Sequence, residues 1–120
     1  MVKRVLCRQR LRQVPAQFSW IDHRLIRDKH TVGRSANALA LYLFLVAVCD
    51  GDGVSYYSDP TLCHLLPLDE SALARARQEL IAAGLIVYQR PLYQVLSLEV
   101  PRPKLDQPMA IGQILKELLP

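Results

Sequence analysis

A run of apolar residues from Ala38 to Cys49 is the feature that most constrains the fold of this chain. Its twelve residues fall well short of the roughly 20 that a membrane-spanning helix needs. Ser35 precedes the run and is a favourable N-cap, whereas the turn sequence at 50–53, Asp-Gly-Asp-Gly, ends it. The pattern therefore predicts a helix over 36–49 that is buried on most of its sides.

Three shorter signals follow this helix. The run 54–57 is rich in β-forming residues and predicts a short strand. Asp59 as the N-cap and Pro60 in the first turn predict a short helix over 61–66, which Pro67 ends.

A longer helix is expected between Asp69, its N-cap, and Gly84, which occupies the C′ position. One face of it carries the apolar residues expected to contact the core: Leu73, Ala76, Leu80 and Ile81. Two β-type runs, 85–89 and 93–98, surround Arg90-Pro91-Leu92 and predict a hairpin.

The ends of the chain differ from its middle. Residues 1–13 are predicted to form a basic arm, and residues 14–99 the folded domain. Within that domain, residues 17–21 have strand character. Four apolar side chains could instead line a short helix that Ser19 or Asp22 caps: Phe18, Ile21, Leu25 and Ile26.

Residues 100–120 are predicted to be a proline-rich linker and an amphipathic helix. Its apolar stripe consists of Ala110, Ile111, Ile114, Leu115, Leu118 and Leu119. This stripe either covers its own domain or pairs with a second chain, which leaves a homodimer open.

Charge is distributed unevenly along the chain. Residues 1–34 contain nine basic and two acidic side chains, a net charge of +7, whereas the other 86 residues contain six basic and nine acidic, a net charge of −3. A basic arm on a less charged domain is typical of polyanion binding, and a solvated tail is the alternative. Three cysteines without a Cys-x-x-Cys pair, and a basic start that no long apolar stretch follows, favour a cytoplasmic protein without disulfides.

The order of long helix, strand, short helix, longer helix and hairpin resembles the winged helix-turn-helix fold, a mainly α member of the α+β class. Residues 71–86 resemble its recognition helix and first wing strand, with a small polar start, Leu80 four residues before Gly84, and Gly-Leu-Ile leading into the strand. Residues 18–26 and 35–43 look like the corresponding domains of plasmid replication initiators and mobile-element proteins. The resemblance covers roughly residues 17–98.

The resemblance implies that the protein binds double-stranded DNA through the face of helix 69–84 that points away from the core. That face carries Ser71, Ala74, Arg75, Gln78 and Ala82. Arg75 and Gln78 are long enough to reach base edges in the major groove. Ser58 and Thr61 would contact phosphate, and Arg90 at the hairpin tip would reach the neighbouring backbone or minor groove. The arm would add affinity that does not depend on sequence, through Lys3, Arg4, Arg8, Arg10 and Arg12.

Some residues favour a second interpretation, a winged-helix module that docks a protein. Asp69 and Glu70 place negative charge at the start of the presumed recognition helix, where phosphates would be repelled. Arg77 occupies a position that is usually apolar in related domains. We expect it to extend along the surface and pair with Glu70 or Asp69.

Catalytic and metal motifs are not predicted. The sequence at 50–53 starts like a calcium loop, but Val54 and Thr61 stand where that motif has ligands. Tyr56 and Tyr57 lack the clustered metal ligands of a DNA-nicking site, so they are read as strand residues with one ring inward and one outward. We therefore expect no enzymatic activity, no cofactor and no small-molecule substrate.

Overall fold

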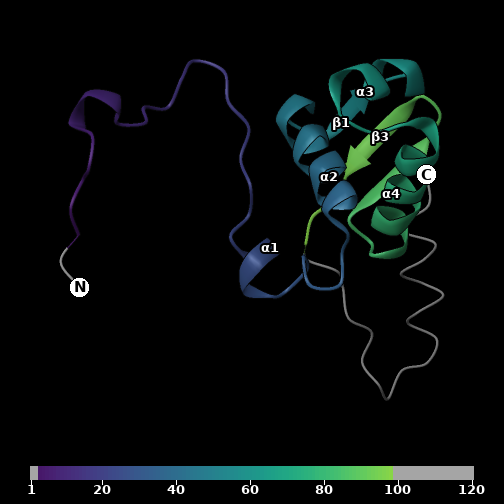
Figure 1. The fold of residues 1–120 in the computed structure, drawn as a ribbon, viewed down its shortest axis with the longest axis horizontal. Helices are drawn as coiled ribbons and strands as arrows, with labels where there is room; N and C mark the ends of the chain where they lie inside the picture. The colour runs from purple at the N-terminus through teal and green to yellow at the C-terminus, as the bar shows by residue number, and fades with distance from the viewer. Residues whose placement is uncertain (1–2, 99–120) are drawn as a thin grey trace.

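The computed structural model, which describes residues 3–98, has a mainly helical α+β fold (Figure 1). Four α-helices and a three-stranded antiparallel sheet occur among these residues, after a short 3-10 helix, η1 (Arg8–Arg10). They follow in the order α1 (Arg24–Arg27), α2 (Ala36–Val48), β1 (Val54–Tyr56), α3 (Asp59–Leu65), α4 (Glu70–Ala82), β2 (Ile86–Gln89) and β3 (Leu92–Val95).

Helix α2 begins where the sequence predicts and ends at Val48, one residue before the predicted end. The Ser35 side chain accepts a hydrogen bond from the backbone N–H of Ala38 (3.1 Å), which confirms the N-cap. After α2, the Asp50 carboxylate accepts hydrogen bonds from the N–H groups of Asp52 (2.9 Å) and Val54 (3.0 Å), which close the turn. Gly53 ends the turn with φ +84°, and a Cβ there would lie 2.6 Å from the carbonyl oxygen of Val95. Only glycine fits so close to β3.

The sheet places β3 between the other two strands, in the order β1-β3-β2. Ser55 of β1 pairs with Tyr93, and Gln89 of β2 pairs with Leu92. The predicted strand and hairpin are confirmed, with a tight connection at Arg90 and Pro91. Tyr57 lies beyond the end of β1 and contacts the core, whereas Tyr56 is exposed. One ring therefore points inward and one outward, as expected.

The caps of α3 and α4 differ in how well the sequence predicts them. Ser58, and not Asp59, is the N-cap of α3, because its side chain accepts the hydrogen bond from the Thr61 N–H (3.4 Å). Asp59 and Pro60 form the first turn instead, so the helix begins two residues earlier than expected. Asp69 caps α4 as predicted, with its carboxylate 2.7 Å from the Ala72 nitrogen.

The core lies between α2, α3, α4 and the inner face of the sheet, and α4 packs against both α2 and α3. Leu73, Ala76 and Leu80 of α4 are buried as expected. Ile81 does not belong to this face, because its side chain is 36% exposed. At about 100° per residue it lies roughly 80° from Leu73 and further still from Ala76, outside the buried arc.

The segment before α2 is mostly exposed. Residues 17–21 form neither strand nor helix, and α1 is a single turn in which only Leu25 is buried. Phe18, Ile21 and Ile26 are exposed, so the alternative in which they line a helix together is wrong. Asp22 rather than Ser19 accepts the hydrogen bond at the start of α1, from the Arg24 N–H (2.9 Å).

The predicted arm extends away from the helices (Figure 1). The Cα radius of gyration is 17.4 Å, against about 14 Å for a compact domain of this length. The Ser19 hydroxyl donates to the carbonyl of Ala47 (3.0 Å) and holds the end of the extended segment against α2. Within residues 3–98 no helix combines the length and the apolar character needed to cross a bilayer. The predicted linker and amphipathic helix at 100–120 lie outside the described residues.

Candidate nucleic-acid interface

Helix α4 presents a polar face to solvent. The predicted DNA-contacting residues on this face are all exposed: Ser71, Ala74, Arg75, Gln78 and Ala82. Three of them are small, so a partner's surface can approach the helix closely, and the long side chains of Arg75 and Gln78 project from it. Arg75 forms no ion pair within residues 3–98. Its guanidinium is therefore available to a ligand.

Arg77, on the inward side of the same helix, is held by α3 and the sheet. Its guanidinium donates to both carboxylate oxygens of Asp59 (2.8 and 3.2 Å) and to the Tyr93 hydroxyl (2.7 Å), and it lies 4.4 Å from the centre of the Tyr88 ring. The predicted pairing with Glu70 or Asp69 is wrong. Position 77 lies at the edge of the buried arc of α4, about 40° from Leu73. Its side chain is only 12% exposed, so its charge needs a partner from another element.

This contact alters the acid–base properties of its members. Hydrogen bonding to Arg77 lowers the pKa of Asp59, and the positive charge of Arg90 adds to the effect. The hydrogen bond with Asp59 raises the pKa of Arg77. Both groups stay charged at neutral pH, and Asp59 neutralises Arg77. The cation at position 77 is thus used in the fold and is not offered to DNA.

The N-terminus of α3 holds the two residues predicted to contact phosphate. Ser58 and Thr61 are both exposed, but the Ser58 hydroxyl donates to Thr61 Oγ1 (2.9 Å) while it caps the helix. Ser58 therefore has no free donor, and Thr61 keeps its own hydroxyl proton for an outside acceptor. Phosphate binding here stays a prediction that rests on Thr61.

The hairpin turn lies beside this helix end. The Tyr57 N–H donates to the carbonyl of Pro91 (3.2 Å), so the turn that carries Arg90 is bonded to the residue just before Ser58. Arg90 is exposed, and its charge contributes to the lowered pKa of Asp59. The fold thus brings Ser58, Thr61 and Arg90 together, although they lie up to 32 positions apart in the sequence.

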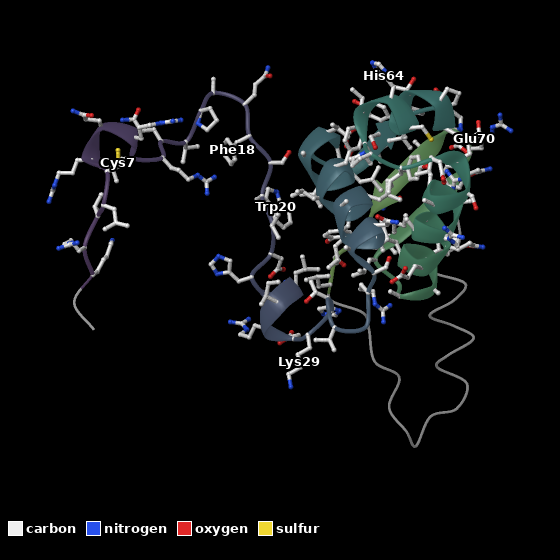
Figure 2. All side chains as sticks on the ribbon, viewed as in Figure 1. Cys7, Phe18, Trp20, Lys29, His64 and Glu70 are labelled. Carbon is white, nitrogen blue, oxygen red and sulfur yellow. The ribbon has the colours of Figure 1, made fainter. Side chains whose placement is uncertain are left out.

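Seven of the nine basic residues in 1–34 fall into two groups. Arg24 and Arg27 pair with the neighbouring Asp22 and Asp28, and the hydrogen bond from Arg24 lowers the pKa of Asp22 to about 2. The five predicted arm residues are exposed and form no ion pair within residues 3–98: Lys3, Arg4, Arg8, Arg10 and Arg12. The arm is therefore a chain of unneutralised positive charges. Figure 2 shows its side chains around Cys7, well away from Glu70 of α4.

Glu79 makes a contact that the sequence does not predict. Its carboxylate accepts hydrogen bonds from both the backbone N–H and the hydroxyl of Ser35 (2.7 Å for the hydroxyl), which joins α4 to the start of α2. These bonds lower the pKa of Glu79. An acid at the N-terminus of a helix is also favoured by the helix dipole. Glu79 and Asp59 are both engaged within the fold, so Asp69 and Glu70 are the exposed acids of α4 and its cap.

Comparison of the chain with protein-family models, with curated proteins and with solved structures gave no match. The assignment of a function therefore depends on the residues and contacts described above.

Proposed function

We propose that the chain is a winged-helix protein that binds double-stranded DNA and acts without catalysis. Three features of the fold support the winged helix. Helices α3 and α4 are joined by the four residues 66–69, as in a helix-turn-helix. Strand β1 separates α2 from α3 and pairs with β3, and the β2–β3 hairpin follows α4.

The observation that carries the proposal is the exposed polar face of α4 on a helix that is anchored from behind. Leu73 and Leu80 bury the opposite face, while Arg77 and Glu79 bond it to α3, the sheet and α2. A rigid helix of this kind suits the major groove. Arg75 would then form two hydrogen bonds to a guanine edge, and Gln78 to an adenine edge.

The arm supplies the part of the affinity that does not depend on sequence. The described chain beyond the arm, residues 14–98, has seven basic and eight acidic side chains, a net charge of −1. That domain alone therefore offers a polyanion no net attraction at long range. The arm's five unpaired cations offset this charge, so the proposal requires the arm and the domain to act together.

A fluorescence-anisotropy titration of a random-sequence duplex, at low and at physiological salt, tests the proposal. We expect binding that weakens steeply as salt rises, because cations on the protein displace the counterions of DNA. An absence of binding at low salt would contradict the proposal. The resemblance to plasmid initiators and mobile-element proteins suggests a regulatory or accessory role for such binding.

The exposed acids of α4 favour one alternative, a module that docks a protein. Asp69 and Glu70 lie at the N-terminal end of the proposed recognition helix, where they would face phosphates. A partner with a basic surface would instead be attracted there. The double variant Asp69→Asn with Glu70→Gln distinguishes the two functions. If the face binds DNA, its affinity for DNA rises; if it docks a basic protein, its affinity for that protein falls.

A further inference from the structure

A groove of about 460 Å³ lies between the N-terminal segment, α2 and the residues that follow β3. Its lining includes Phe18, Trp20 and Ile21 of the N-terminal segment, Tyr42 and Val46 of α2, and Leu98. Figure 2 shows Phe18 and Trp20 on the extended segment next to α2. Its volume is within the range of about 300–1,000 Å³ that is usual for sites that bury apolar groups.

The apolar residues of this groove are poorly covered within the described part of the chain. Phe18 is 64% exposed, Trp20 73% and Ile21 45%. Exposed aromatic rings that line an apolar groove are unusual on a protein surface and indicate a contact with another segment or molecule. Such rings lose the most apolar area when they become covered, so an occupant would be bound mainly by the hydrophobic effect.

We propose that the occupant is the chain's own C-terminal segment, with its apolar stripe seated in the groove. The described chain ends in the groove itself, because residues 95–98 line it. Beyond Leu98 come the linker residues 99–109 and then a stripe that includes Ile111, Ile114 and Leu118. In a helix these three residues lie on one face, so they can enter the groove together.

The linker is long enough to bring the stripe back. Its eleven residues span at most about 36–40 Å when extended. The stripe can therefore approach the groove from any of its open sides. Because it is tethered, its concentration at the groove is of the order of millimolar. A second copy of the chain reaches that concentration only in very concentrated solution, so the tethered segment is favoured.

Trp20 is the single tryptophan of the chain, so its fluorescence reports directly on the groove. In the full-length protein we expect a blue-shifted emission and weak quenching by acrylamide. The double variant Ile114→Asp with Leu118→Asp should expose Trp20, with a red shift and severalfold stronger quenching. The control Gln113→Asp with Lys116→Gln changes the net charge equally on the opposite face, and should behave like the parent.

The mass in solution, measured by light scattering, identifies the occupant. A shielded Trp20 in a monomer, exposed by the stripe variant and not by the control, supports the proposal. Three results would overturn it: an exposed Trp20 in the parent, a Trp20 that the stripe variant leaves shielded, or shielding that appears only as the protein dimerises. The last result would assign the groove to a second copy. Circular dichroism checks that the stripe variant keeps the helices α2 to α4, which bury their own core.

Discussion

Arg77 of α4 and Asp59 of α3 are joined by two hydrogen bonds of 2.8 and 3.2 Å, and the same guanidinium reaches the Tyr93 hydroxyl at the centre of the sheet. One side chain thus links both helices of the proposed helix-turn-helix to the wing. The side chain of Arg77 is 12% exposed and that of Asp59 39%. Loss of the carboxylate would leave the more buried partner, Arg77, without its counter-charge.

We predict that Asp59→Ala lowers the free energy of unfolding by about 1–2 kcal/mol, less than a fully buried pair would lose because Asp59 is partly solvated. Urea denaturation measures this loss. Arg77→Met should also destabilise the fold, and the double variant should lose less than the sum of the two single losses. Strict additivity would mean that the two side chains do not stabilise each other.

The same pair predicts a pH dependence. Arg77 holds the pKa of Asp59 below its ordinary value of about 3.8. As the pH falls below that value, the unfolded chain takes up a proton before the folded protein does, so stability is lost between that pH and the lower pKa of the folded state. Urea midpoints measured from neutral to acidic pH should show this loss in the parent. The Asp59→Asn variant should not show the part of this loss that comes from protonation of the Asp59 carboxylate. In the Arg77→Met variant the pKa of Asp59, measured by NMR, should return toward its ordinary value.

Alanine substitutions at two glycines of the same turn should differ in their effect on stability. Gly53→Ala should lower the free energy of unfolding by about 1–3 kcal/mol, because alanine is strained at positive φ. Its Cβ would also meet the Val95 carbonyl, 2.6 Å away. Gly51→Ala is the matched control, since a Cβ there meets nothing within 4 Å. Thermal unfolding of both variants measures the difference, and equal melting temperatures would contradict the account of this turn.

The arm predicts the salt dependence of DNA binding. Replacing all five of its basic residues with Gln should reduce the slope of log K against log salt by up to about 4.5, if each contacts one phosphate. The residues are Lys3, Arg4, Arg8, Arg10 and Arg12. A matched variant with Lys at all five positions should keep the parent slope. An unchanged slope in the Gln variant would remove the arm from the interface.

Local sequence signals predicted most of the fold. Ser35 and Asp69 as caps, Gly84 as a C′ residue and three of the four predicted apolar positions on α4 are short-range features that the structure confirms. Where two local signals compete, the prediction failed. Ser58 and Asp59 are both good caps and Pro60 fits either of the first two helical positions, so sequence alone does not choose between them.

Contacts between residues far apart in the sequence hold the candidate site together, and local sequence patterns do not predict such contacts. Arg77 binds residues 18 and 16 positions away, and Glu79 binds Ser35, which is 44 positions away. The nearby acids Asp69 and Glu70 were the obvious partners for Arg77, but they lie on the solvent side of the α4 N-terminus. The available signal was the position of Arg77 within the apolar stripe, which requires a partner from another element.

Whether the exposed face of α4 reads DNA is tested most directly by position 75. After selection of a preferred duplex from a random pool, anisotropy titrations compare the parent with Arg75→Ala and Arg75→Lys. We predict that Arg75→Ala weakens binding to the selected site by about 1–3 kcal/mol. Arg75→Lys should keep binding to random duplexes but discriminate less between sites, because lysine lacks the planar two-donor geometry. Equal affinity of the parent and Arg75→Ala for both duplexes would contradict it.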